Sequence, residues 1–321
     1  MHPFTYYPAI TLDDALARIA EPRHVPIGGG TDLLVTIAEQ LASPVAVVDV
    51  RALEGMLGIA SVADGGLRIG ASVRLADIAA HDLVRSRFPA LASACEQVGT
   101  PAIREMATLA GNLCQRPRCW YFRRNIPCLK NGGSGCPARE GENQYLAILE
   151  GDPCFIVHPS DPAVALVALD ATIEIASTNG RRDVLASEFY VLPRERLDRE
   201  TVLEDGELVI GIRLPGAAAG GLQRYVKLMQ RDAWDFALAS LAAVRRVDGE
   251  VRLVLGGVAP RPYRIYTSVE EEATSGGLDE ETIAGLAERA LLDADPLSKN
   301  GYKVTMAATL LRDAIRELAA E

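Results

Sequence analysis

The chain has 321 residues, more than one hydrophobic core usually organises, so we expect two or three subdomains. It carries 43 acidic and 33 basic residues, and its formal charge of −10 argues against nucleic acid or an anionic membrane as a partner. No apolar run is long enough to span a bilayer, and the first residues lack the features of an export signal, so we expect a soluble chain without a signal of its own.

The N-terminal segment predicts a small unit of helices and a strand that presents a glycine loop. Residues 11–20 have apolar side chains at helical spacing, and Thr11 is the expected N-cap. Consecutive glycines follow at Gly28–Gly30, and a second short helix is expected from Leu33. The run Val45–Val50 is rich in β-branched residues, which is typical of a buried strand.

The rest of the chain alternates strands and helices around a cysteine-rich segment. In chain order we expect strands at 57–62 and 67–71 around a turn at 64–66, helices across 75–98, an apolar helix at 162–169, and strands at 172–176 and 208–214. Residues 215–221 contain one proline and three glycines and form the best linker candidate. Beyond them we expect strands at 223–229, 237–244 and 252–258, then helices near 280–291 and 302–319. The C-terminal part should therefore be a three-stranded sheet covered by helices.

The glycine loop has the features of a phosphate cradle. Glycines allow positive φ and a close approach of the backbone, so several N–H groups can converge on one phosphate, and the helix from Leu33 would add its positive end. Thr31 and Asp32 offer polar side chains beside it. The spacing is not that of a Rossmann fingerprint, because the third glycine position falls on Leu33. On these residues alone, a tight turn and a ligand cradle are equally good interpretations.

The cysteine-rich segment is the strongest local anomaly. Five of the six cysteines fall between positions 114 and 154; they are Cys114, Cys119, Cys128, Cys136 and Cys154. In a chain without a secretory signal this density favours metal or redox chemistry. The absence of a C-x-x-C pair argues against zinc ribbons, bacterial ferredoxin motifs and thioredoxin-like chemistry. Four thiolates could hold an iron–sulfur cubane, whose negative charge five basic residues would offset: Arg116, Arg118, Arg123, Arg124 and Lys130.

Two other interpretations of the cysteines remain open at this level. Four thiolates satisfy a structural zinc ion, and two disulfides would satisfy the same count in an oxidising compartment. Cys95 lies in an apolar helical pattern and is expected to be a small buried hydrophobic residue.

Several motifs together resemble one family. In chain order they are Ile27–Leu33, Thr108–Leu113, His158–Asp161, the segment Tyr225–Ala237, and Leu255–Ala259. This series is similar to the flavin-binding medium subunit of xanthine dehydrogenase-type molybdenum hydroxylases. The resemblance implies an α+β fold: a vanillyl-alcohol-oxidase-like (PCMH-type) FAD-binding fold in two subdomains, residues 1–55 and 56–215, with a cluster loop at about 114–156. A C-terminal domain at 221–321, like that of CO dehydrogenase flavoproteins, would follow.

The same resemblance implies the cofactor site. The residues expected to contact FAD are Ile27, Gly28, Gly29, Gly30, Thr31, Asp32, Leu33, Thr108, Gly111, Asn112, Gln115, Ser160, Asp161 and Lys227. No residue of this chain is expected to be catalytic, because substrate chemistry would take place in a partner subunit. His158 fits a structural role and a flavin contact equally well. Ser160–Pro162 also reads as an ordinary helix N-cap, and Gly111–Asn112 as an ordinary turn.

The cysteine loop resembles an insertion found in the FAD subunit of periplasmic aromatic aldehyde oxidoreductases and, more distantly, in the flavin subunit of 4-hydroxybenzoyl-CoA reductases. In the aldehyde oxidoreductase pattern the position of Cys114 is not a cysteine. The resemblance therefore implies a [4Fe-4S] cluster held by Cys119, Cys128, Cys136 and Cys154, with Cys114 left over.

The implied function is electron transfer in a heterotrimer. A large subunit would hold the molybdopterin cofactor, a small subunit two [2Fe-2S] clusters, and this chain would pass electrons through FAD to an external acceptor. An aldehyde is the expected substrate, with N-heterocycle hydroxylase or aromatic acyl-CoA reductase subunits as alternatives. Rival hypotheses are a stand-alone flavin oxidoreductase with a structural zinc loop and a non-catalytic, zinc-stabilised assembly module. The location would be cytoplasmic, or periplasmic by co-export with a signal-bearing partner.

Overall fold

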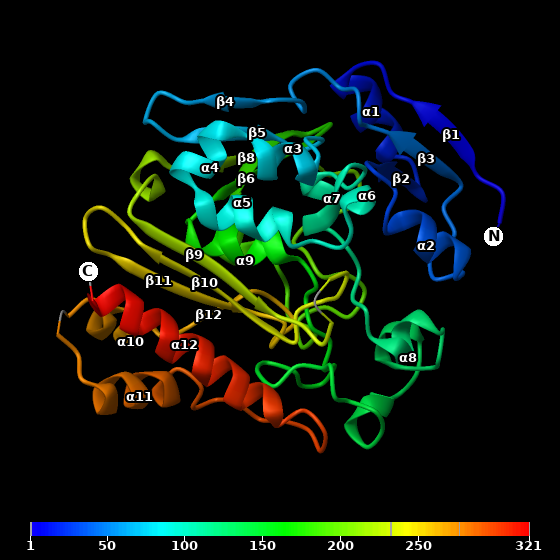
Figure 1. The fold of residues 1–321 in the computed structure, drawn as a ribbon. Coiled ribbons are helices and arrows are strands. Elements are labelled where there is room, and N and C mark those ends of the chain that lie inside the picture. The colour runs from blue at the N-terminus through cyan, green and yellow to red at the C-terminus, as the bar shows by residue number, and fades with distance from the viewer. Residues whose placement is uncertain (1, 232, 276, 321) are drawn as a thin grey trace.

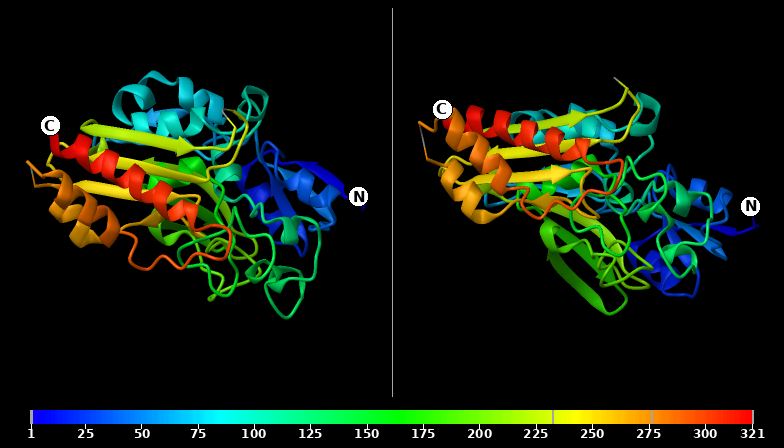
Figure 2. Two further views of the ribbon diagram at one scale, coloured as in Figure 1. Left: turned by 60° about the horizontal axis from the view of Figure 1, so that its bottom comes forward. Right: turned by 90° about the horizontal axis from the view of Figure 1, so that it is seen from below.

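The computed structural model describes residues 2–231, 233–275 and 277–320. Its main body stacks a sheet, a helix layer, a second sheet and a second helix layer (Figure 1). A small N-terminal unit and the cysteine-rich segment lie together at one end of this stack, and the C-terminal helices lie toward the other (Figure 2). No helix among the described residues is long and apolar enough to cross a bilayer.

The N-terminal unit is a parallel three-stranded sheet with two helices. Its elements are β1 (Thr5–Pro8), α1 (Leu12–Ile19), β2 (His24–Ile27), α2 (Leu33–Ala38) and β3 (Ala46–Asp49). The strand order is β1-β3-β2, so the β-branched run forms the central, fully buried strand, as predicted. Both predicted helices are confirmed, and Thr11 Oγ1 caps α1 by accepting from the Asp14 N–H. The edge strands β1 and β2 were not predicted, because each has four residues and contains a proline.

The second sheet has five strands, each antiparallel to its neighbours, in the order β4-β5-β8-β6-β7. The strands are β4 (Ile59–Ser61), β5 (Leu67–Gly70), β6 (Thr172–Ser177), β7 (Gly180–Leu185) and β8 (Leu208–Leu214). The adjoining helices are α3 (Leu75–Ala80), α4 (Asp82–Arg87), α5 (Pro89–Glu96) and α9 (Asp161–Ala168). β7 was not predicted, because its mostly exposed, charged sequence lacks an apolar alternation.

The C-terminal sheet has four antiparallel strands, in the order β12-β11-β10-β9, where three were predicted. They are β9 (Leu222–Leu228), β10 (Ala239–Arg245), β11 (Val251–Gly256) and β12 (Tyr263–Arg264). The additional strand β12 has two residues, too few for a periodic pattern. The outer helices are α10 (Thr267–Ala273), α11 (Glu280–Arg289) and α12 (Tyr302–Ala320). The helix α10 was also not predicted.

Strand β10 shows how this sheet joins the two helix layers. Leu241 and Ala243 belong to the apolar core under α10, α11 and α12, whereas Ala242 and Val244 belong to the core around α5 and α9. Successive strand residues point to opposite faces, so a continuous apolar run is required here. The linker candidate at 215–221 is packed as well, because Ala218 is fully buried and its carbonyl accepts from Gln223 Nε2 at 2.8 Å.

The cysteine-rich segment has little regular structure. It contains the short helix α8 (Trp120–Arg123) and the 3-10 turns η1 (Leu129–Asn131) and η2 (Pro137–Arg139). Two short helices precede it, α6 (Pro101–Arg104) and α7 (Leu109–Leu113). Two further 3-10 turns follow later in the chain, η3 (Ala186–Glu188) and η4 (Gly216–Ala218). Asn300 Nδ2 donates to the carbonyls of Leu146 and Ala147, at 3.2 and 3.0 Å. Lys303 Nζ donates to the Tyr145 carbonyl at 3.0 Å. The start of α12 therefore holds the returning arm of this segment against the C-terminal sheet.

Candidate functional site

Three of the motifs that carry the resemblance lie next to one another in the structure: Ile27–Leu33, Thr108–Leu113 and His158–Asp161. Thr108 Oγ1 accepts from the Gly111 N–H at 3.2 Å and so caps α7. Ser160 Oγ accepts from the Ala163 N–H at 3.1 Å, which caps α9, and donates to Asn112 Oδ1 at 2.6 Å. Ser160 is thus both the N-cap of α9 and a residue of the candidate site. Ser160 joins two motifs 48 residues apart in the sequence.

The glycine loop packs directly against the second motif. A Cβ on Gly29 would lie 1.8 Å from the Met106 carbonyl oxygen, and one on Gly28 would lie 2.5 Å from Thr108 Oγ1. Gly30 has a φ of +71°, in the left-handed region. The backbone N–H groups of residues 28–32 have no intramolecular acceptor in the part of the chain that the structure describes. The loop therefore presents a row of free donors, as an anion site requires.

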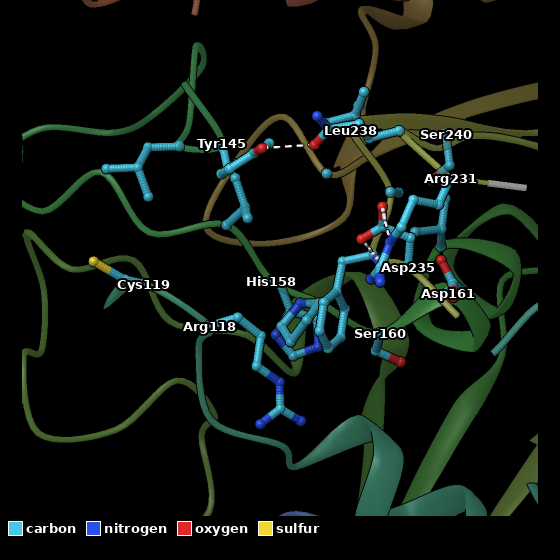
Figure 3. A pocket seen from close by; sticks show the side chains of 18 of the residues that line it. Arg118, Cys119, Tyr145, His158, Ser160, Asp161, Arg231, Asp235, Leu238 and Ser240 are labelled. Atoms are coloured by element: carbon cyan, nitrogen blue, oxygen red, sulfur yellow. Dashed lines mark hydrogen bonds and ion pairs between the residues drawn. The ribbon is translucent and has the colours of Figure 1, made fainter. Parts of the chain in front are cut away.

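Beside the loop lies a cleft made of two adjoining cavities of about 380 and 280 Å³. Residues that line both cavities are Arg118, Pro159, Asp161, Arg231, Asp235 and Phe236. Figure 3 shows the first cavity from close by, with Arg118 and His158 next to each other and Cys119 further along the same loop. Together these cavities form the candidate cofactor cleft.

The predicted site residues fall into four groups. Those that line the cofactor cleft are Thr31, Asp32, Gly111, Asn112, Gln115, Ser160, Asp161 and Lys227. Ile27 and Leu33 instead belong to the small apolar cluster of the N-terminal unit and anchor the two ends of the glycine loop. Thr108 faces a separate cavity of about 550 Å³ on the far side of that loop. Gly28, Gly29 and Gly30 form the loop itself.

Two residues that line the cleft form a buried ion pair. Lys227 Nζ lies 2.7 Å from Asp161 Oδ2 and also donates to the Gln97 carbonyl at 3.0 Å. The Tyr225 hydroxyl donates to the other oxygen of Asp161 at 2.6 Å. Burial raises the pKa of Asp161 above its ordinary value, and the Lys227 ammonium and the Tyr225 hydroxyl oppose that rise. These bonds connect α9 to β9 at the base of the cleft.

Asp32 has partners that the sequence did not reveal. Its carboxylate accepts from the Arg116 N–H at 2.8 Å and from Arg123 Nη2 at 2.8 Å, and it pairs with Arg118 Nη1. Burial by itself raises the pKa of Asp32, but the charges of Arg118 and Arg123 outweigh it and lower that pKa below its ordinary value. Asp32 therefore ties the glycine loop to the cysteine-rich segment.

His158 is a buried polar residue without a partner. Its side chain lines the first cavity, only 4% of it is exposed, and both ring nitrogens lack a hydrogen-bond partner among the described residues. The ring packs against Tyr190, with ring centres 4.3 Å apart. Burial, with the nearby charge of Arg118, lowers the pKa of His158 to about 3, so the imidazole is neutral. The two ring nitrogens have almost no accessible surface, so other atoms of the His158 ring line the cavity.

The four cysteines singled out by the resemblance line one small cavity. Cys119, Cys128, Cys136 and Cys154 face it together with the apolar side chains Phe122, Leu129, Leu146, Phe155 and Ile156. Cys114 lies outside it and packs against the main core, and Cys95 is fully buried there. All six cysteines are free thiols. Burial raises the pKa of Cys154 to about 12, so thiolates at this site need a compensating cationic centre.

The charge compensation predicted for the cysteine loop is only partly present. Lys130 lines the cysteine cavity, whereas Arg118 and Arg123 pair with Asp32, and Arg116 pairs with Glu200 at 2.7 Å. Lys130 itself lies 2.7 Å from Glu200. Arg116, Arg118 and Arg123 therefore hold the cysteine-rich segment to other parts of the chain. The composition of the segment does not show which carboxylates its basic residues pair with.

Comparison with known proteins decides the family. Residues 2–217 match the family described as the FAD binding domain in molybdopterin dehydrogenase, and residues 224–318 match the CO dehydrogenase flavoprotein C-terminal domain. The chain belongs to the molybdopterin dehydrogenase FAD-binding family. It is 37% identical over 326 residues to the aldehyde oxidoreductase FAD-binding subunit PaoB of Escherichia coli K12, with both chains fully covered.

More distantly similar proteins match this chain over almost its whole length. The xanthine dehydrogenase FAD-binding subunit of Escherichia coli O157:H7 is 26% identical, covering 98% of this chain and 96% of its own. Among solved structures, quinoline 2-oxidoreductase from Pseudomonas putida 86 has a TM-score of 0.76 at 23% identity, covering 99% and 97%. Carbon monoxide dehydrogenase from Hydrogenophaga pseudoflava has a TM-score of 0.74 at 23% identity, with both chains fully covered. The predicted α+β fold is confirmed.

Some cleft residues of this family member were missed or undervalued in the sequence. Trp234, Arg231 and Asp235 lie in the Tyr225–Ala237 segment and line the cofactor cleft, although none of them was predicted to contact FAD. Asp232 of the same segment lies outside the described residues. Trp120, Tyr145 and Phe236 also line the cleft; the first two come from the cysteine-rich segment and carry no motif.

Proposed function

We propose that this chain is the FAD- and [4Fe-4S]-containing electron-transfer subunit of a heterotrimeric molybdenum hydroxylase. The observation that carries the proposal is the cofactor cleft, where three separate motifs meet. There Thr31 and Asp32 of the glycine loop line one of the two adjoining cavities, and His158 lines the other. An extended ligand with an anionic centre and a polar ring system would reach from one cavity into the other.

The residues present fit a flavin dinucleotide. Bound FAD supplies the ability to accept electrons singly and to release them singly or in pairs. The N–H groups of the glycine loop would donate to its pyrophosphate, as backbone nests do for anions. Ser160 and Asn112 hold each other at 2.6 Å and keep α7 and α9 in position on either side of the cleft. Asp161 and Lys227 hold α9 against β9 and offer polar atoms at the base of the cleft.

The cysteine cavity brings together the four thiols that the proposed [4Fe-4S] cluster needs. Cys119, Cys128, Cys136 and Cys154 all face it, although they are spread over 36 residues of the chain. The choice of a cluster over a structural zinc ion rests on the resemblance of this loop to the insertion of the aldehyde oxidoreductase FAD subunits.

Similarity to PaoB supports an aldehyde as the substrate of the whole complex, because the match is 37% identical and covers both chains completely. In this proposal a large subunit holds the molybdopterin cofactor and performs the substrate chemistry. A small subunit with two [2Fe-2S] clusters delivers the electrons, and an external acceptor removes them from this chain. The complex would be cytoplasmic, or periplasmic if a signal-bearing partner carries it across the membrane.

Anaerobic reduction of the flavin tests the electron-transfer role. The assembled complex is mixed with an aromatic aldehyde without an acceptor, and the flavin absorbance is followed. We expect the flavin bands to bleach, because electrons from the partner subunits have no other exit. Flavin that stays oxidised while the [2Fe-2S] clusters become reduced would contradict the proposal.

Matched cysteine variants test the cluster. Cys128→Ser should lower the iron and acid-labile sulfide of the complex by about four atoms each, because it removes one ligand of the cubane. Cys114→Ser is the control, since Cys114 lies outside the cysteine cavity, and it should leave both contents unchanged. Equal iron in the two variants, or zinc in place of iron, would favour the zinc-loop flavoprotein instead.

A further inference from the structure

Arg118 comes from the cysteine-rich segment but its side chain lies in the cofactor cleft. It immediately precedes Cys119, and it lines both adjoining cavities. Its Nη1 pairs with Asp32, and its Nη2 donates to Gln115 Oε1 at 2.9 Å. The guanidinium also lies 5.2 Å from the centre of the Phe236 ring. One side chain thus contacts the glycine loop, Gln115 just after the second motif, and the segment that follows β9.

The Nε–H of Arg118 is left without a partner. That nitrogen is buried and makes no hydrogen bond among the described residues, although both Nη atoms are engaged. His158 lines the same cavity with two further unpaired nitrogens. A buried donor without an acceptor costs about 1–3 kcal/mol. These nitrogens have almost no accessible surface, so other atoms of the two side chains line the cavity. Two neighbouring side chains share this state.

The other basic residues of the segment differ from Arg118 in position, although Arg116 Nε and Arg123 Nη1 are also buried without a hydrogen-bond partner among the described residues. In the described part of the chain, Arg116, Arg123, Arg124 and Lys130 do not line the cofactor cleft. Arg116 and Lys130 pair with Glu200, and Arg124 is exposed. The position of Arg118 is therefore specific and does not follow from the general basic character of the loop.

We propose that Arg118 contacts the bound flavin dinucleotide and places one positive charge beside it. This inference rests on the proposed function, because it requires FAD in the cleft. Since Arg118 is held by Asp32 on one side and precedes Cys119 on the other, the cysteine-rich segment supplies part of the flavin site. The insertion then contributes to cofactor binding as well as holding a cluster.

Flavin titration of the full chain tests the proposal. FAD is removed under anaerobic conditions, and rebinding is followed by flavin fluorescence. Arg118→Met should raise the dissociation constant by about tenfold or more, because the positive charge beside the cofactor is lost. Arg118→Lys should raise it less, since the charge remains and only the planar guanidinium is lost. Arg124→Met is the matched control from the same loop and should bind as the wild type does.

Iron content separates a direct contact from a structural role. If Arg118 only holds the loop in place, Arg118→Met should lose iron and FAD together. If it contacts the cofactor, iron stays at the wild-type level while FAD affinity falls. Wild-type affinity in Arg118→Met or Arg118→Lys would overturn the proposal, as would a parallel loss of iron. Failure of the wild-type chain itself to bind FAD would instead refute the proposed function.

Discussion

Asp161 illustrates how single side chains serve both fold and site. It is the first residue of α9, it is buried, and its two carboxylate oxygens accept from Tyr225 and Lys227 on β9. A buried charge of this kind depends on its partners, because removing one of them leaves an uncompensated ion. The same carboxylate lines the cofactor cleft, so stability and cofactor binding are coupled at this residue.

Removing the charge partner of Asp161 should be costly. Lys227→Met should lower the free energy of unfolding of the flavin-free chain by about 3–5 kcal/mol, because the carboxylate stays buried without its ammonium. The double variant Lys227→Met with Asp161→Asn should recover part of this loss, since no charge remains. Denaturant unfolding of the wild type and both variants measures the difference. A double variant no more stable than the single one would contradict the assignment.

Acid should destabilise the protein through His158. The pKa of His158 in the folded chain is about 3 and its ordinary value is 6.5, so the unfolded chain binds a proton between these two pH values and the folded chain does not. The contribution of His158 is complete above pH 6.5 and is lost as the pH falls toward 3, by about 2 kcal/mol at pH 5.

The variant His158→Phe should lack this part of the acid sensitivity. His2→Gln, which alters an exposed histidine near the N-terminus, should retain it. The measurement is the free energy of unfolding of the flavin-free chain at pH 7 and at pH 5. An equal loss between these two pH values in His158→Phe and the wild type would show that another group is responsible.

Among the elements, the glycine loop is the most sensitive to substitution. Gly29→Ala should destabilise the chain by about 1–3 kcal/mol and weaken FAD binding, because the added methyl group meets the backbone carbonyl of Met106 at 1.8 Å. Gly285→Ala in α11 is the control: its Cβ meets nothing within 4 Å, and the change should stabilise that helix by about 0.5–1 kcal/mol. Thermal unfolding and flavin titration compare the two. Normal stability in Gly29→Ala would contradict the close packing.

Elements with a strong local pattern could be predicted and weakly patterned ones could not. The amphipathic helices α1 and α12 and the apolar strands β3, β8 and β10 all have a periodicity or a run that identifies them. Strands β1, β2, β7 and β12 are short, interrupted by proline or highly charged, and they exist because a neighbouring strand offers hydrogen-bond partners. Such tertiary pairing leaves no signal in the local sequence.

At the scale of the whole molecule, the motifs predicted the family but not the contacts that connect distant parts of the chain. The pairing of Asp32 with Arg118 and Arg123 spans 86 and 91 residues, and no spacing rule predicts it. The bonds from Asn300 and Lys303 to the returning arm of the cysteine-rich segment span more than 150 residues. These contacts make one body of the flavin cleft, the cysteine cavity and the C-terminal helix.

Cofactor analysis of the assembled complex tests the central claim most directly. The complex is isolated without oxygen and denatured, and the released flavin is identified and compared with the amount of this chain. We predict FAD in equal amount to the chain, because one cleft joins the three motifs. A folded, fully assembled complex that contains molybdenum and [2Fe-2S] clusters but no flavin, or that releases another nucleotide in its place, would contradict the account.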